Sequence, residues 1–190
     1  MQVRFLTSSL FILLLSSANA FAQSSTWIID KNQTQVDFQI RRVPVSNVHG
    51  FFSGITGTVI WDEKNLSKSS VEVVIPTTSI STNNSMRDSD LKSSNFFDVQ
   101  KYPTMIFKST AVIGTPGHLQ VVGDLTLAGI TKSVTLNVDG PTPPARMGKL
   151  ILGFSATGTL KRSDFNFAPK YPNAILGDEI RFTIDAEADQ

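Results

Sequence analysis

The stretch HLQVVGDLTLAGITKSVTLNVD, residues 118–139, carries the pattern that decides the fold. Its apolar side chains keep to one face of an extended chain on either side of a short Ala128-Gly129 turn, while polar side chains occupy the other face. The apolar positions are Leu119, Val121, Leu125, Leu127, Val134, Leu136 and Val138. The pattern predicts two neighbouring antiparallel strands with one buried face.

The same alternation recurs along the chain outside this stretch. It is clear in residues 35–41, 150–161 and 179–187 and weaker in residues 26–30, 51–61, 71–75 and 104–113. Turn sequences such as Gly114-Thr115-Pro116-Gly117 separate the runs. Eight or more strands at this spacing predict an all-β fold, either an antiparallel barrel or a sandwich.

The first 22 residues have the features of a secretory signal peptide. Arg4 precedes a leucine-rich run, and two overlapping small-residue sites end at Ala20 and Ala22. We expect cleavage after Ala20 or Ala22, so that residues 23–190 form one domain located in the periplasm. Other apolar runs are only a few residues long, and we expect no membrane-spanning segment in the mature chain.

Composition excludes several classes of function. The whole chain has 17 basic and 16 acidic residues, and loss of Arg4 leaves the mature chain neutral, which argues against a nucleic-acid partner. The sequence contains no cysteine, so no disulfide, thiolate nucleophile or acylated cysteine anchor can form. Only two histidines, His49 and His118, are available for a metal site, and no G-x-S-x-G motif is present. We therefore expect no metal, no cofactor and no enzymatic activity.

One segment breaks the strand pattern. Residues 81–92 are polar and predict a single short helix with Asn83 or Asn84 as its N-cap, followed by the adjacent aromatic residues Phe96 and Phe97. Two interpretations fit this segment. It is either a lid over the mouth of a barrel or a connecting helix whose two phenylalanines fill the core.

The inward faces of the predicted strands mix bulky and small side chains. Such a mixture suits either a packed core or a barrel with room for an apolar ligand. For the second case, the side chains expected to line the cavity are Phe38, Ile40, Phe52, Phe96, Phe97, Phe107, Leu125, Leu127, Phe154, Ala156 and Phe182. Polar side chains expected to bind a head group at the mouth are Arg42, His49, Asp90 and Arg162.

Five stretches in this order resemble the YceI-like family of bacterial periplasmic polyisoprenoid-binding proteins. They are FSGITGTVIWD (52–62), MRDSDLKSSNFFDVQKYPTMIFKS (86–109), VGDLTLAGITKSVTL (122–136), GFSATGTLKRSDF (153–165) and LGDEIRFTIDAEA (176–188). The resemblance implies an eight-stranded antiparallel, lipocalin-like barrel with a short helical lid segment. It also implies a cavity for a long isoprenoid or acyl lipid, such as a polyprenyl phosphate, a quinone or a fatty acid, and often a homodimer.

The sequence departs from the pattern of this family at three positions. Arg42 and Asp90 stand where the family often has histidine, and Asn166 stands where it often has glycine. These changes affect the polar end of the expected site rather than its apolar interior. Two alternatives stay open at this point: an enzyme acting on a lipophilic substrate in the cavity, and an outer-membrane β-barrel.

Overall fold

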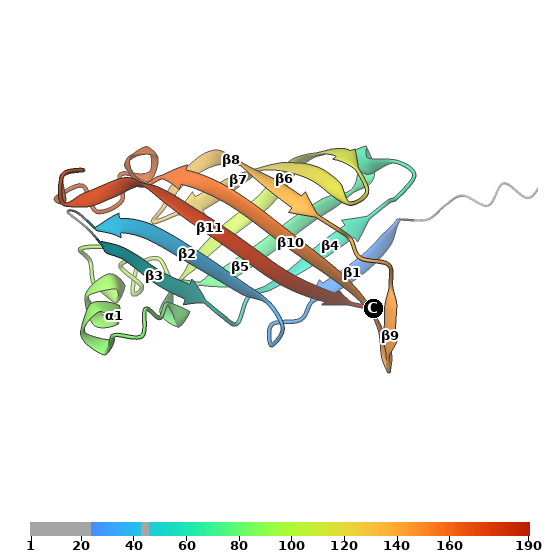
Figure 1. Cartoon of the computed structure of the whole chain (residues 1–190), viewed down its shortest axis with the longest axis horizontal. Coiled ribbons are helices and arrows are strands. Elements are labelled where there is room, and N and C mark those ends of the chain that lie inside the picture. Colours follow the sequence, from blue (N-terminus) through green and yellow to red (C-terminus); the bar gives the residue numbers. More distant parts are fainter. Residues whose placement is uncertain (1–23, 43–45) are drawn as a thin grey trace, which may run out of the picture.

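The computed structural model describes residues 24–42 and 46–190, and the predicted signal peptide lies outside the described residues. Strands run along an elongated barrel, with one helix at one end and the C-terminus at the other (Figure 1). The strands are β1 (Ser25–Ile29), β2 (Gln35–Arg42), β3 (Ser46–Phe52), β4 (Thr56–Trp61), β5 (Ser70–Pro76), β6 (Thr104–Thr115), β7 (His118–Leu127), β8 (Ile130–Asp139), β9 (Ala145–Met147), β10 (Lys149–Lys161) and β11 (Leu176–Asp189).

These segments form a closed antiparallel barrel of eight staves, where a stave is either one strand or two successive strands that share the same neighbours. β1 and β2 follow one another along β11, and β3 and β4 follow one another along β2 and β1. β5 to β8 and then β10 continue the barrel, and pairing of β10 with β11 closes it. Closure leaves no long free sheet edge, which is the usual way such folds avoid edge-to-edge association. The predicted eight-stranded antiparallel barrel is confirmed.

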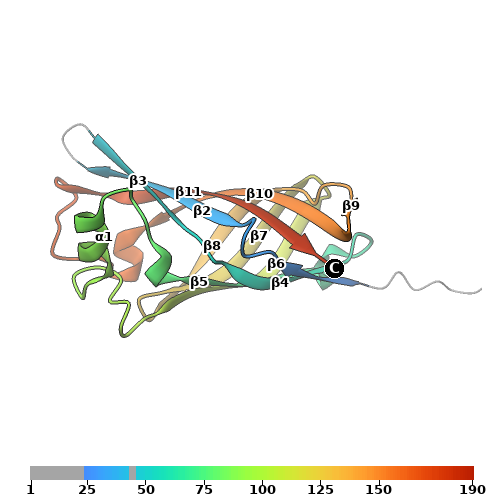
Figure 2. The same ribbon diagram turned by 90° about the horizontal axis from the view of Figure 1, so that it is seen from below.

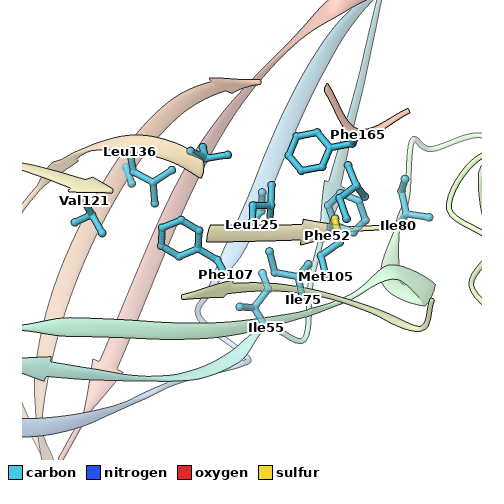
Figure 3. Packing of buried hydrophobic residues seen from close by; sticks show 14 of the residues in the cluster. Phe52, Ile55, Ile75, Ile80, Met105, Phe107, Val121, Leu125, Leu136 and Phe165 are labelled. Carbon is cyan, nitrogen blue, oxygen red and sulfur yellow. The ribbon is translucent and has the colours of Figure 1, made fainter. Parts of the chain in front are cut away.

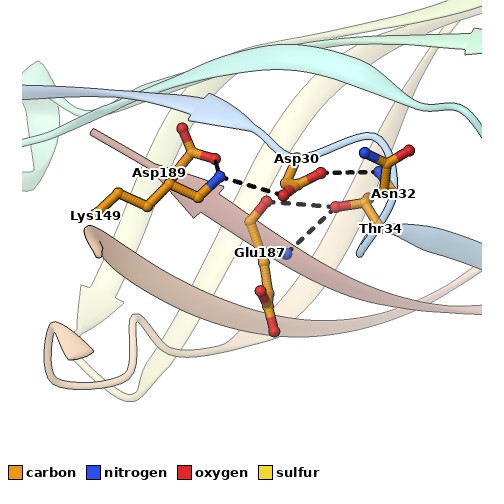
Figure 4. Close-up of polar contacts among 6 residues, drawn as sticks. All are labelled: Asp30, Asn32, Thr34, Lys149, Glu187 and Asp189. Atoms are coloured by element: carbon orange, nitrogen blue, oxygen red, sulfur yellow. Dashed lines mark hydrogen bonds and ion pairs between the residues drawn. The ribbon is translucent and has the colours of Figure 1, made fainter. Parts of the chain in front are cut away.

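Two of the staves contain a break, one between β1 and β2 and the other between β3 and β4. The predicted strand over residues 51–61 is interrupted after β3, where Gly54 adopts a φ of +67° that disfavours other residues. Between β1 and β2, the hydroxyl of Thr34 donates to the carbonyl of Glu187 at 3.4 Å and accepts from its N–H at 3.3 Å (Figure 4). The side-chain hydroxyl thus replaces a ladder contact, and β11 stays paired across the break.

An ionic cluster fixes the same break to the end of the barrel. Lys149 of β10 bonds to Asp189 of β11 and lies 3.4 Å from a carboxylate oxygen of Asp30 (Figure 4). The backbone N–H of Asn32, at 2.9 Å, lowers the pKa of the Asp30 carboxyl. The hydrogen bond to Asp189 raises the pKa of the Lys149 ammonium. Both shifts favour the charged forms that hold this end together.

The apolar faces of the strands point into the barrel. Along β7 the buried residues are Leu119, Val121, Gly123, Leu125 and Leu127, which is the face that alternation predicts. Side chains from different strands, such as those of Phe52 on β3, Phe107 on β6 and Leu125 on β7, point into the same interior (Figure 3). A barrel that spans an outer membrane carries its apolar band on the outside instead.

Helix α1 (Ser85–Lys92) lies at the end of the barrel opposite the C-terminus, as the two perpendicular views show (Figures 1 and 2). Its N-cap is Asn84, whose side chain accepts from the N–H of Arg87 at 3.0 Å, as the sequence predicts. Three short 3-10 helices, Leu66–Lys68, Thr77–Ser79 and Arg162–Phe165, complete the fold. Over residues 24–42 and 46–190, none of the helices is long and apolar enough to cross a bilayer.

Candidate functional site: a long apolar cavity

The barrel encloses a cavity of about 770 Å³. This volume falls in the upper part of the range of about 300–1,000 Å³ usual for ligand pockets. Along β11 its lining runs from Leu176 to Ala188, which is about 40 Å of strand. The tilt usual for barrel strands reduces this to about 30 Å along the barrel axis. The space is therefore long enough for an extended chain.

All eleven side chains expected to line a cavity do line it. Phe38, Ile40, Phe52, Phe96, Phe97, Phe107, Leu125, Leu127, Phe154, Ala156 and Phe182 surround the space. Across the part of the chain that the structure describes, the charged lining residues are Arg42, Arg87 and Asp90. The interior is thus apolar, and the packed-core interpretation does not hold for this barrel. Whether these side chains contact a ligand stays a prediction.

The cavity opens at the end where α1 lies. Every lining residue that is exposed belongs to this end: Arg42, Asn84, Met86, Asp90 and Ile175. They come from the last position of β2, from the N-cap and both turns of α1, and from the segment that leads into β11. We call this end the mouth. Two of the predicted head-group residues, Arg42 and Asp90, lie there.

The two phenylalanines after α1 pack beside the mouth. Phe97 is buried and lies with its ring centroid 5.5 Å from that of Phe52 and 4.7 Å from that of Phe167. Phe96 stacks on Tyr171 at 5.2 Å. The rings join the core and also line the cavity, so they match the connecting-helix interpretation, while α1 itself lies at the mouth.

A small polar network fixes α1 to the chain that precedes it. Arg87 donates from Nε to the hydroxyl of Thr82 at 2.7 Å and from a terminal nitrogen to the Thr82 carbonyl at 2.9 Å. The Thr82 N–H and hydroxyl donate to the carboxylate of Asp88. These contacts use the carboxylate of Asp88 at the start of the helix. Arg87 lines the cavity, but its hydrogen bonds to Thr82 give it a structural role there.

His49 does not belong to the mouth, contrary to the prediction. It lies on β3 between Val48, which lines the cavity, and Gly50, which is buried. Successive side chains of a strand point to opposite faces, so the exposed imidazole lies on the outside of the barrel.

Arg162 is also placed differently from the prediction. Its side chain is 3% exposed and does not line the cavity. The five N–H groups of the guanidinium contact six acceptors at 2.6–3.2 Å, one N–H of the terminal nitrogen Nη2 being shared, and all the acceptors lie in residues 167–177. The acceptors are the carbonyls of Phe167, Ala168, Tyr171, Leu176 and Gly177 and the side-chain oxygen of Asn173. The residue therefore ties residues 167–173 to the start of β11, and its N–H groups are occupied by acceptors of the protein.

Sequence reasoning missed several lining residues of this segment. Tyr171, Ile175 and Leu176 reach the cavity from a stretch without alternation, so no period marked them. A local signal existed at Asn166, which adopts a φ of +47° in the left-handed region. Glycine and asparagine are the residues that tolerate this conformation best, which accounts for an asparagine at this position.

Comparison with known proteins agrees with this geometry. The YceI-like domain model matches residues 27–188. The chain belongs to the YceI-like family. It is 39% identical over 162 residues to protein YceI of Escherichia coli O157:H7, covering 82% of this chain and 83% of the relative.

Two solved structures share the barrel of this YceI-like protein. BcnA of Burkholderia cenocepacia superposes with a TM-score of 0.73 at 23% identity, covering 84% of this chain and 98% of that chain. A polyisoprenoid binding domain from Saccharophagus degradans, implicated in plant cell wall breakdown, gives 0.66 at 12% identity, covering 86% and 97%. At these identities the likeness concerns the fold.

Proposed function

We propose that this protein is a periplasmic carrier that holds the chain of a long isoprenoid or a related lipid inside its barrel. The observation that carries the proposal is the cavity itself, which is long, apolar along the barrel and charged only at its mouth. The signal-peptide features of residues 1–22 and the polyisoprenoid-binding domain that shares the fold support the location and the ligand class.

The energetics favour a long chain over a short one. Burying each methylene contributes about 0.8 kcal/mol. Immobilising a ligand costs about 4–15 kcal/mol. A chain of about ten carbons therefore offsets this cost only if the cost lies in the lower half of that range, and longer chains give net affinity. An extended polyprenyl or acyl chain suits a cavity of this length better than a compact ligand does.

The mouth is the place for a polar head. The exposed guanidinium of Arg42 lines it and can donate charge-assisted hydrogen bonds to a phosphate or carboxylate. Asp90 on α1 lies at the same end and can accept a hydrogen bond from a hydroxyl or an amine of the head. We propose a polyprenyl phosphate, an isoprenoid quinone or a fatty acid as cargo, bound rather than chemically converted. We also propose a homodimer, which light scattering on the purified protein tests.

Mass spectrometry of an organic extract from gently purified protein tests the proposed function. A stoichiometric isoprenoid or acyl species is expected in wild type and not in Ala156→Phe, because Ala156 is buried in the cavity wall. Thr157→Phe is the matched control, since Thr157 is the exposed next residue of β10 and faces outward. Equal lipid content in wild type and Ala156→Phe, or none in wild type, contradicts the proposal.

A further inference from the structure

A row of two phenylalanines flanked by two glycines crosses four neighbouring strands of the barrel. Gly158 of β10 lies opposite Phe182 of β11, Phe182 lies opposite Phe38 of β2, and Phe38 lies opposite Gly50 of β3. Both phenylalanines line the cavity. The order across the wall is therefore glycine, phenylalanine, phenylalanine, glycine.

Each ring lies over the glycine beside it. A Cβ built on Gly158 would be 2.4 Å from Cζ of Phe182, and a Cβ on Gly50 would be 2.4 Å from Cζ of Phe38. Such distances are far below contact, so each ring occupies the space that a side chain at the glycine would fill. The two adjacent rings thus extend in opposite directions, each toward its own glycine.

The opposite wall has one glycine and one phenylalanine in similar contact, diagonally across the ladder, since Gly123 pairs with Ser109 and Phe107 with Leu125. A Cβ on Gly123 of β7 would be 2.4 Å from Cζ of Phe107 on β6, and Phe107 also lines the cavity. Strands β6 and β7 lie across the barrel from β11 and β2 in the order of the staves. Packing of an aromatic ring over a glycine of the next strand is a known way to compensate the missing side chain. Here it also keeps three large side chains against the wall.

We propose that these three glycines set the width of the cavity and make room for a methyl-branched chain, and this inference rests on the proposed function. A ring that lies against the wall leaves the axis of the barrel free. A ring displaced from its glycine has the cavity as its free space, because the other sides of the site are strand backbone. Width matters more for an isoprenoid than for an acyl chain, since its methyl branches enlarge the cross-section.

Gly158 offers the sharpest test of the three. The nearest atoms to a Cβ there all belong to the ring of Phe182, whereas a Cβ on Gly50 or Gly123 would also meet a backbone carbonyl. Gly153 is the matched control on the same strand. The three atoms nearest to a Cβ there belong to the side chain of Thr142, the first at 3.3 Å, and the residue faces outward by strand parity.

The experiment compares two probe alcohols with purified, delipidated protein. Geranylgeraniol carries methyl branches, and hexadecanol has an unbranched chain of the same backbone length and the same head group. Binding is followed by displacement of a fluorescent probe from the cavity. Gly158→Ala is expected to weaken geranylgeraniol by about tenfold or more and hexadecanol by clearly less. Gly153→Ala should change neither affinity.

A second pair of variants separates the ring from the backbone. In a Phe182→Leu background the shorter side chain no longer reaches residue 158, so adding Gly158→Ala should cost less than about twofold for geranylgeraniol. A crystal structure of Gly158→Ala should show the Phe182 ring turned into the cavity.

The outcomes separate this inference from the proposed function. Equal weakening of both alcohols in Gly158→Ala, no weakening of either, or a Phe182 ring left in place overturns the role of the glycines while the carrier function stands. Failure of wild type to bind either alcohol overturns the proposed function instead, and the ring position in the Gly158→Ala structure still decides the geometry.

Discussion

Replacing Arg162 by methionine should release the segment between β10 and β11 from the barrel. The side chain of Arg162 is 3% exposed and bonds six acceptors of residues 167–177, among them the carbonyls of Phe167 and Ala168. Methionine fills the space of the aliphatic part of the arginine side chain, but it donates no hydrogen bond. The substitution therefore removes the donors while leaving the packing nearly intact.

The magnitude follows from the acceptors left behind. The carbonyls of Phe167 and Ala168 are bonded in fully buried surroundings, and an unsatisfied buried acceptor costs about 1–3 kcal/mol. The other four acceptors are partly buried and can recover contacts with water. Removing a buried charge returns part of the cost. We expect a net loss of about 3 kcal/mol in the free energy of unfolding, or a Tm lower by about 6–12 °C.

Urea unfolding followed by circular dichroism measures this loss. The control is Arg181→Met on β11, where the side chain is exposed and pairs with Glu179 at 2.7 Å. Exposed ion pairs contribute little, so the control should stay within about 0.5 kcal/mol of wild type. Arg162→Lys should lower the free energy of unfolding by most of the same amount, because a single ammonium cannot serve six acceptors. If Arg162→Met proves as stable as Arg181→Met, the assignment of Arg162 as the anchor of this segment is refuted.

Three further outcomes follow from single sites. Arg42→Gln should weaken palmitate by about two- to fivefold and leave hexadecanol unchanged in the displacement assay, whereas His49→Gln should alter neither; an equal loss for both ligands contradicts a head-group role for Arg42. Asp30 has a lowered pKa. The stability that its carboxylate contributes to the fold is therefore present above pH 3.8, the ordinary pKa of this group, and is lost as the pH falls further. Lys149 has a raised pKa. The stability that its ammonium contributes to the fold is therefore present below pH 10.5, the ordinary pKa of this group, and is lost as the pH rises further. The stability difference between wild type and Lys149→Met should accordingly be constant from about pH 5 to 9 and shrink at both extremes, and a flat difference in pH-dependent thermal melts argues against the cluster. Asn166→Ala should cost about 1 kcal/mol by chemical denaturation and Asn166→Gly less than half of that, and equal losses contradict a backbone origin.

Alternation was enough to predict the barrel wall and the direction of its side chains. Leu125 and Ala156 line the cavity because inward positions recur every second residue, and this period is visible without coordinates. Helix α1 was also predictable, since Asn84 caps it by a local rule. The sequence could not predict whether the interior is filled or hollow, because that depends on how rings such as Phe182 lie relative to the next strand.

The errors at the polar end have a common physical origin. Arg162 follows Lys161 at the end of a strand, a position typical of a solvated charge, and its partners are carbonyls of a segment with no pattern of its own. Main-chain acceptors leave no trace in a sequence. His49 could have been assigned to the outside by parity, had the strand over Ser46–Phe52 been recognised, but Gly50 and the break near Gly54 weaken its alternation.

Under the proposed function, the chain and the head group of the lipid would be recognised in separate parts of this cavity, and this separation predicts which substitution changes which property. A buried chain gains about 0.8 kcal/mol per methylene along the whole barrel. An exposed charge at the mouth contributes no more than about 1 kcal/mol. Substitutions at Arg42 or Asp90 are therefore expected to leave most of the affinity for the chain in place while they change the preferred head. A change at Gly158 is expected to have the opposite effect, since it alters the width available to the chain and leaves Arg42 and Asp90 in place. Relatives that differ only at the mouth are thus expected to share a chain and differ in its head, and a binding screen with two chains and two heads distinguishes these cases.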